Sequence, residues 1–456
     1  MRNTRFSRTS LTKQAFVFTS LFAASGMTLS EETETPSWDV SAPNYSAEVQ
    51  EIDLNVTEGT WMNLDVSPDG EHIAFDLLGD IYQIPITGGE ATPLLSGHAW
   101  EVQPQYSPDG RFLAFTSDRN GADNIWVMDL ANPDNKHQIT HESFRLLNNP
   151  SWHPSGEYLV AKKHFTTSRS LGTGEVWLYD ANVDQALARG NLQGSVLVKR
   201  PSPAFQKELG EPTFSADGES VFYIQNTTPG NTFIYHEDSN GEVMAIKRYD
   251  LETGEIEKVV GGAGGAVRPT PSPDGKTIAF VKRVRAASRL FVMDLVSGEQ
   301  TMLVDDLDPD MQETWAVQGA YPTMAWTPDG DSIVYWSKGH IWRVDVASGE
   351  SRQILFSVND TRTAYPAVEV AVDVAPDTLK TTMPRFARQS PDGQAVVFES
   401  MGRLYVKRDG EDAKRLTRDN ASGFEFSPAF SPDGKDVFYL TWSDDELGSV
   451  RKVSAR

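Results

Sequence analysis

The stretch KKHFTTSRSLGTGE at residues 162–175 is one of the most chemically diverse in the chain. It gathers Lys163, His164, Arg169 and Glu175 around two glycines. Charged side chains in a long loop on a rigid scaffold are typical of ligand or domain contacts. The same polar groups can also serve the backbone of the loop itself, so both interpretations remain open.

Two further long stretches have a similar character. TPGNTFIYHEDSNGEVMAI spans 228–246, and DLDPDMQETWAVQGAYP spans 306–322. The second contributes Asp310, Glu313 and Trp315 as candidate contact residues. As in the first stretch, a purely structural role is the alternative for both.

Several kinds of catalytic site are absent from the sequence. None of the eight histidines forms H-x-H or H-E-x-x-H, the spacings that bring two imidazoles to one metal. There is no cysteine and no G-x-S-x-G nucleophile motif. GGAGGAVRP at 261–269 lacks the lysine of a phosphate-binding loop. We therefore expect no catalytic residue, no metal ligand and no cofactor in this chain.

A tetrapeptide that recurs along the chain defines the elements that carry these loops. Its eight copies are SPDG at 67–70, SPDG at 107–110, HPSG at 153–156, SADG at 215–218, SPDG at 272–275, TPDG at 327–330, SPDG at 390–393 and SPDG at 431–434. The Ser or Thr side chain can bond to nearby backbone, Pro presets φ near −65°, and Gly accepts the left-handed conformation. Each copy is therefore predicted to join two antiparallel strands.

The segments around each turn predict four short strands in about 40 residues, which is one propeller blade. We therefore predict an all-β fold, a β-propeller of four-stranded antiparallel blades. Turn counting gives eight blades, and seven is the alternative because HPSG and SADG are degenerate. Aromatic side chains of the long loops can then plug the channel or pack between blades.

The last copy lacks a fourth strand, whereas the chain begins with an unpartnered one. EVQEIDLNV at 48–56 alternates apolar and polar residues. We expect it to complete the final blade and close the ring, because an open ring leaves edges prone to aggregation. The alternative is an open ring with a flexible leader.

The amino terminus predicts export. A basic start is followed by the apolar run AFVFTSLFAASGMTL at 15–29 and then by the acidic EETETPS. This order is typical of a secretory signal peptide, with an uncleaved anchor as the alternative. We assign 1–30 to the signal peptide, 31–46 to a linker and 47–456 to the propeller, and expect a periplasmic or secreted protein. The net charge of −23 argues against nucleic acid as a partner, and no membrane span is expected after signal removal.

The blade unit resembles the TolB-type propeller repeat. Closer still is the resemblance to the amino-terminal propeller of exported bacterial amidohydrolases, carried by 61–94, 117–129, 163–180, 264–285, 310–316 and 441–451. These segments include the long loops, and they add Arg268, Asp445 and Glu446 to the candidate contacts.

In that family a metal-dependent amidohydrolase barrel follows the propeller. The resemblance implies C–N bond hydrolysis through water activated by a divalent, zinc-like metal held in the barrel. The barrel is missing from this sequence, so no catalytic residue can be carried over. We expect a non-catalytic module that gates or recruits substrate, or docks a catalytic amidohydrolase domain in cis or in trans. The alternative is a TolB-like interaction module with periplasmic envelope partners; a propeller that is itself an enzyme is a third possibility.

Overall fold

The computed structural model describes residue 40 and residues 49–168, 171–235, 237–238, 240–365, 372–418 and 423–456. These residues form strands throughout, with one short helix, α1 (Val183–Arg189). The predicted all-β class is confirmed. Within the described ranges, no helix is long and apolar enough to cross a membrane. The predicted signal peptide and all of the predicted linker except Val40 lie outside the described residues.

The recurring tetrapeptide is a tight turn in every copy. In the first, the Gly70 N–H donates to the Ser67 carbonyl at 2.8 Å, and the His72 N–H donates to Ser67 Oγ at 2.9 Å. The closing glycine has positive φ in all eight copies, which are Gly70, Gly110, Gly156, Gly218, Gly275, Gly330, Gly393 and Gly434. The predicted turn chemistry is therefore confirmed, since only glycine adopts this conformation without a steric cost.

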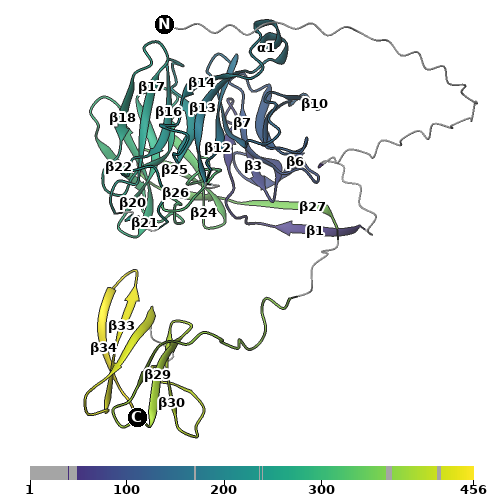
Figure 1. Cartoon of the computed structure of the whole chain (residues 1–456). Helices are drawn as coiled ribbons and strands as arrows, with labels where there is room; N and C mark the ends of the chain where they lie inside the picture. Colours follow the sequence, from purple (N-terminus) through teal and green to yellow (C-terminus); the bar gives the residue numbers. More distant parts are fainter. Residues whose placement is uncertain are drawn as a thin grey trace, which may run out of the picture. The chain divides into compact units, whose positions relative to one another are not determined.

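Six of the turns lie in four-stranded antiparallel sheets between residues 64 and 354 (Figure 1). The first three blades are β2 (Leu64–Val66), β3 (His72–Leu77), β4 (Asp80–Pro85) and β6 (Thr92–Leu95); β7 (Glu101–Tyr106), β8 (Phe112–Ser117), β9 (Asn124–Asp129) and β10 (Asn132–Gln138); and β11 (Leu147–Trp152), β12 (Tyr158–Thr166), β13 (Gly172–Asp180) and β14 (Ser195–Val198).

The next three blades repeat this order. They are β15 (Leu209–Phe214), β16 (Ser220–Asn226), β17 (Met244–Asp250) and β18 (Ile256–Val260); β19 (Val267–Pro271), β20 (Thr277–Val284), β21 (Ala287–Asp294) and β22 (Gln300–Val304); and β23 (Ala325–Trp326), β24 (Ser332–Ser337), β25 (His340–Asp345) and β26 (Ser351–Ile354).

These six blades close on one another. The segment just before the inner strand of the sixth blade is bonded to the start of the first blade: the Leu64 N–H donates to Thr323 Oγ1 at 2.8 Å, and the Thr323 N–H donates to Asn63 Oδ1 at 3.1 Å. A further bond joins the turn between β24 and β25 to the segment before β2, where the Gly59 N–H donates to the Gly339 carbonyl at 2.9 Å. The ring is therefore six-bladed, and the predicted ring of eight or seven blades is not confirmed. The number of turns predicts the number of sheets, but it does not predict which of these sheets pack together in one ring.

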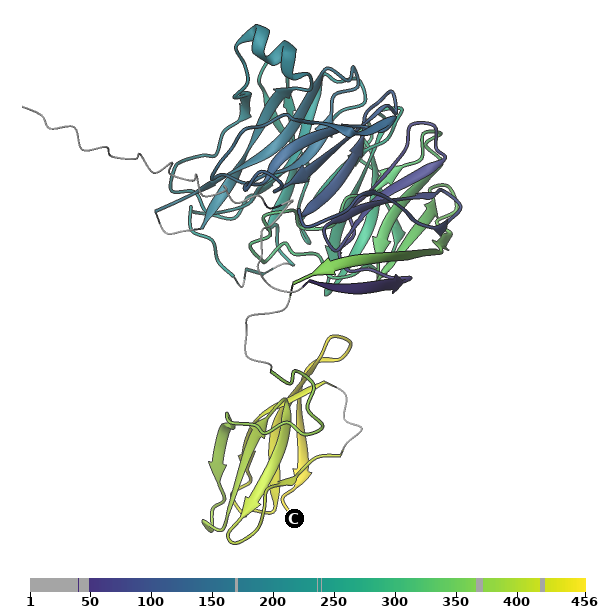
Figure 2. The ribbon, with the colours of Figure 1, turned by 90° about the vertical axis from the view of Figure 1, so that its right-hand side faces the viewer.

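The predicted closing strand forms but has a different partner. β1 (Gln50–Val56) pairs antiparallel with β27 (Phe356–Ala364), and the two lie side by side in both views (Figures 1 and 2). β27 also pairs with β5 (Gly89–Glu90). Closure of the last blade by 48–56 is thus wrong, because the alternating pattern of β1 fits β27 as well as it would fit a fourth blade strand.

The last two turns belong to a separate pair of sheets. One is β28 (Arg385–Gln389), β29 (Ala395–Ser400), β30 (Arg403–Arg408) and β31 (Lys414–Arg415); the other is β32 (Phe424–Phe430), β33 (Asp436–Ser443) and β34 (Leu447–Ser454). Val397 and Val437 are fully buried in the core of this pair.

The core of the ring lies between blades. One cluster joins Ala74 and Ile81 of the first blade to Leu113 and Phe115 of the second, all fully buried. Because a middle blade strand packs against a neighbour on both faces, β3 is buried almost throughout. This packing fixes the inner strands around the axis, where the candidate site lies.

Candidate functional site

Each inner strand of the ring presents two side chains at fixed distances before its turn. Two residues before the turn stand Asp65, Gln105, Ser151, Thr213, Thr270 and Ala325. Four residues before it stand Asn63, Gln103, Asn149, Glu211, Arg268 and Thr323. We call these sets the upper ring and the lower ring. They repeat because strand side chains alternate with a period of two.

The two rings enclose a funnel of about 380 Å³ on the propeller axis. All of the upper ring and all of the lower ring except Asn63 line it. Turn prolines such as Pro68, Pro108 and Pro273 line it as well. The funnel thus extends from the turns down to the lower ring.

A β-bulge in four of the inner strands directs lower-ring side chains to the axis. The strand register shifts at this point in β7, β11, β15 and β19. The residues at the shift, Gln103, Asn149, Glu211 and Arg268, have φ values of 61°, 54°, 50° and 55°. Left-handed backbone at a residue other than glycine costs free energy, and bulges of this kind are known to redirect side chains next to functional sites.

The lower ring binds a loop segment, residues 317–321, which we call the floor segment. Lys162 Nζ donates to the Val317 carbonyl at 2.6 Å, and Gln103 Nε2 donates to the Gln318 carbonyl at 2.8 Å. The floor segment is therefore bonded to residues of several blades at the lower ring.

Arg268, one of the sequence-predicted contacts, is the anchor of the floor. Its Nε donates to the Tyr321 carbonyl at 2.7 Å, and its Nη1 donates to Asn149 Oδ1 at 3.1 Å. Glu211 pairs with its Nη2 at 3.3 Å and also accepts the Ala320 N–H at 2.6 Å. Burial lowers the pKa of Arg268, and the Glu211 carboxylate opposes that effect. These bonds satisfy most of the guanidinium, so it acts mainly to hold the floor segment.

Asp65 is the charged member of the upper ring. Its Oδ2 accepts the Tyr106 N–H of the next blade at 2.7 Å, and the side chain is half-buried. Burial raises the pKa of Asp65 to about 7, while the N–H groups of Tyr106 and Val66 act in the opposite direction. Among the described residues, no Lys or Arg forms an ion pair with Asp65, so its charge faces the funnel without a cation.

The structure places Lys163 and Glu175 opposite each other on β12 and β13. Lys163 Nζ lies 4.3 Å from the Trp177 ring centre and pairs with Glu142. Glu175 accepts the Trp177 Nε1–H at 3.1 Å. The predicted contact residue Arg169 lies outside the described residues. The described part of this cluster is thus largely paired internally.

His164 lies on the other face of β12 and contacts the third predicted loop. Its ring is 5.5 Å from that of Trp315, edge to face, and only 3% of the residue is exposed. Within the described part of the chain, neither ring nitrogen has a hydrogen-bond partner. Burial, reinforced by the cationic Lys162, lowers the pKa of His164 to about 3. A neutral histidine packed on Trp315 supports the loop that leads to the floor segment.

Asp310 and Glu313 both bind Arg283. Arg283 Nη2 contacts Asp310 Oδ1 at 2.7 Å, and its Nη1 contacts Glu313 Oε1 at 2.7 Å. Ser288 Oγ donates to Asp310 Oδ2 at 2.6 Å. These contacts tie the loop before the floor segment to the fifth blade.

Asp445 and Glu446 lie in the turn between β33 and β34, in the pair of sheets at the carboxyl end. Glu446 pairs with Arg451 at 2.5 Å. Among the described residues, no hydrogen bond or ion pair joins Asp445 or Glu446 to a residue that lines the funnel.

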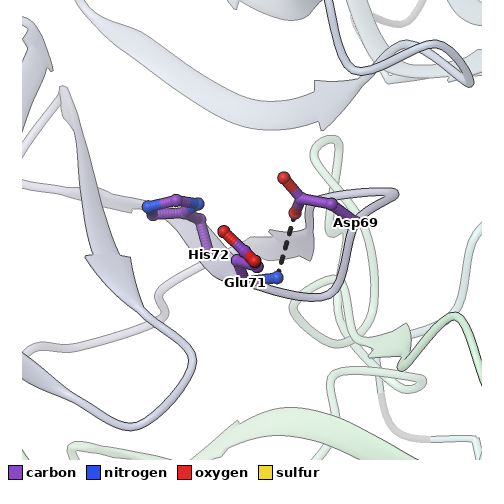
Figure 3. A group of neighbouring side chains, drawn as sticks. All are labelled: Asp69, Glu71 and His72. Carbon is purple, nitrogen blue, oxygen red and sulfur yellow. Dashed lines mark hydrogen bonds between the residues drawn. The ribbon is translucent and has the colours of Figure 1, made fainter.

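Among the described residues, one group has three potential metal ligands close together: Asp69, Glu71 and His72 (Figure 3). The Asp69 carboxylate accepts the Glu71 N–H at 2.9 Å, as the matching aspartate does in other turns. Because Asp69 is engaged in closing the turn and both acids are exposed, we assign this group to the turn. These exposed residues are a poor fit to a zinc-like site, which is usually built from several His or Cys ligands.

The upper ring was missed by the sequence prediction. Its signal was present, since each member stands two residues before a recognised turn. Only the ring geometry reveals that this position faces the axis in every blade.

The fold and site define a six-bladed β-propeller with a polar funnel. Residues 49–195 match the family model of the TolB beta propeller domain. This part of the chain, which holds the first two blades and the third up to the start of β14, is therefore similar to that domain.

Comparisons of the whole sequence find more distant relatives. The chain is 26% identical over 240 residues to the uncharacterized peptidase YuxL of Bacillus subtilis, covering 52% of this chain and 30% of that protein. It is 25% identical over 305 residues to tricorn protease homolog 1 of Streptomyces coelicolor, covering 66% of this chain and 25% of that protein. The chain thus spans less than a third of the length of either relative.

TolB itself is also similar. The Tol-Pal system protein TolB of Francisella tularensis is 24% identical over 277 residues, covering 59% of this chain and 55% of that protein. The crystal structure of TolB from Acinetobacter baumannii aligns with a TM-score of 0.47 and 16% identity over 66% of each chain.

Proposed function

We propose that this chain is a non-catalytic propeller module of an exported hydrolase, in which the funnel recruits ligand for a catalytic domain. The observation that carries the proposal is the funnel of about 380 Å³ lined by both rings. A polar pocket at the axis of a rigid ring is suited to bind a ligand without reacting with it, because its groups are mostly amides and hydroxyls.

The parent enzyme is proposed to act on C–N bonds. The resemblance to amidohydrolase propellers supports this, and relatives named as a peptidase and a protease are consistent with it. In both, the matched part covers a minority of the protein, which supports a modular arrangement. The metal chemistry would belong to the catalytic domain, since nothing in the funnel supplies a zinc-like set of ligands.

The test is a binding experiment with a funnel-blocking variant. A library of short peptides is screened against the full chain and against Gln105→Trp, whose larger side chain fills the upper ring. Val296→Trp is the control, because Val296 is 93% exposed in a turn and is not among the residues that line the funnel. We expect peptides that bind the wild-type chain and the control, and bind Gln105→Trp at least tenfold more weakly. Equal binding by all three proteins contradicts the proposed function.

A second candidate is a TolB-like interaction module of the cell envelope. The match of residues 49–195 to the TolB beta propeller domain favours it. The two candidates differ in the ligand that binds. If the chain is a TolB-like module, a purified envelope lipoprotein should bind the wild-type chain and bind Gln105→Trp more weakly, whereas short peptides should not bind.

Export is part of both candidates. The TolB matches and the amino-terminal sequence support a periplasmic location. Fractionation of cells that express the full chain should recover it from the periplasm or medium, and recovery from the cytoplasm contradicts this.

A further inference from the structure

The upper ring combines one acid with neutral polar groups. Asp65 is its ionisable member, and Gln105, Ser151, Thr213 and Thr270 supply an amide and three hydroxyls. Ser151 Oγ and Thr213 Oγ1 lie 3.3 Å apart, so they already share a hydrogen bond across two blades. All of these groups can accept hydrogen bonds from a ligand.

Asp65 has acceptor capacity that the protein does not use. The N–H groups of Tyr106 and Val66 act on its carboxylate, which has lone pairs for further donors, and Asp65 lines the funnel. The lower ring contains one cation, Arg268. Its guanidinium is already bound to Glu211, Asn149 and the Tyr321 carbonyl. The charged residues that line the funnel are the acids Asp65 and Glu211 and the base Arg268. Their formal charges sum to one negative charge.

The wall above Asp65 is apolar. Pro68 and Pro108 come from the turns of the first two blades, and both line the funnel. Trp152 and Trp326 line it as well, with their indole N–H groups bound to the carbonyls of Gln105 and Thr270 at 3.1 and 2.9 Å. Their polar atoms are therefore already satisfied, so what these two residues add to the funnel wall is apolar.

We propose that the funnel binds a primary ammonium group on an aliphatic chain, with the ammonium against Asp65 and the chain along the turn prolines. A cation gains from Asp65, its N–H groups can donate to the hydroxyls of the upper ring, and its methylene groups replace water on the prolines. An anion of the same shape is repelled by Asp65. This inference rests on the proposed function, because it names the class of ligand that the funnel recruits.

The probe is hexylammonium, with hexanoate and hexanol as matched anionic and neutral compounds, titrated calorimetrically into the full chain at pH 8. We expect hexylammonium to bind at least tenfold more tightly than either. Asp65→Asn keeps the acceptor for the Tyr106 N–H and should weaken binding at least tenfold. Asp331→Asn is the charge-matched control on an exposed turn aspartate, and it should bind as the wild type does.

A second pair of variants tests the same site with Asp65 intact. Thr213→Lys places a competing ammonium group in the upper ring, and Thr213→Met has similar length without charge. Thr213→Lys should weaken binding at least fivefold more than Thr213→Met. Equal binding of hexanoate, or unchanged binding by Asp65→Asn, overturns the proposal.

The natural source of the ammonium group is distinguished by two further probes. N-acetyl-lysine amide offers only a side-chain ammonium, and trialanine amide offers only an amino terminus. Binding of either supports the proposal and identifies the source. Peptide binding that is lost in Gln105→Trp but unchanged in Asp65→Asn would overturn this inference and leave the proposed function standing, whereas peptide binding unaffected by Gln105→Trp would overturn the proposed function.

Discussion

At the scale of single residues, Asp65 links the stability of the ring to pH. Its folded-state pKa of about 7 lies above the ordinary value of 3.8, so the folded protein holds a proton that the unfolded chain releases at lower pH. The stabilising contribution is complete below about pH 4 and is lost as the pH rises through 7. Each pKa unit corresponds to about 1.4 kcal/mol, and water in the funnel reduces the total below the roughly 4 kcal/mol of three units.

Asp65→Asn removes this dependence, because the amide does not titrate. Relative to the wild type, the variant should gain roughly 2 kcal/mol in free energy of unfolding between pH 5 and pH 8. Urea unfolding at both pH values measures it, with Asp331→Asn as the control whose difference from the wild type should not change. A constant difference between Asp65→Asn and the wild type contradicts the raised pKa.

Prediction of single residues from the sequence succeeded where a backbone conformation requires one particular residue type. The closing glycine of each turn has positive φ, as the motif required. It also drew attention to Arg268 and Trp315, which hold or support the floor. It missed Asp65, since a single aspartate before a turn looks like any polar strand residue until the ring brings six such positions together.

At the scale of elements, the floor segment depends on one glycine. Gly319 has a φ of 121°, and a Cβ there would collide with Arg268 Nη2. Gly319→Ala should therefore displace the segment and cost roughly 2–4 kcal/mol in free energy of unfolding, by combining backbone strain with a lost contact at a buried cation.

A matched control separates those two effects. Gly298 also has positive φ, at 74°, but nothing lies within 4 Å of a Cβ built on it. Gly298→Ala should cost only the strain, about 1–2 kcal/mol. Hydrogen exchange at the Ala320 N–H, which donates to Glu211, should become faster in Gly319→Ala alone. If both substitutions change this exchange rate equally, Gly319 does not determine the position of the floor segment.

Strand pairing was the element-level feature that the sequence could not decide. The alternation in β1 predicts a strand with one buried face, and the strand is present. Its partner is β27 because Arg362 of β27 pairs with the buried Asp80 of the first blade at 2.6 Å, which fixes β27 beside that blade. Sequence periodicity holds no information on such a contact between positions so far apart in the chain.

At the scale of the whole molecule, the ring closes at six blades without using any strand of the sheets at the carboxyl end of the chain. Every interface in the ring has a bond between neighbouring blades, including the one from Thr323 to Asn63 that joins the last to the first. All of these residues precede position 366. The pair of sheets from 385 onward has its own core around Val397 and Val437.

Brief trypsin treatment should therefore cut the chain after Lys380 without unfolding the ring. Residues 372–386 are exposed throughout, so the bond is accessible. The fragment that ends at Lys380 should unfold cooperatively at a midpoint within about 4 °C of the ring transition in the intact chain, since no interface of the ring is lost. It should also bind hexylammonium with unchanged affinity. The variant Lys380→Gln with Arg385→Gln should resist this early cut. A fragment that unfolds or aggregates on cleavage would mean that the sheets beyond 385 complete the ring, as a count of eight turns suggests.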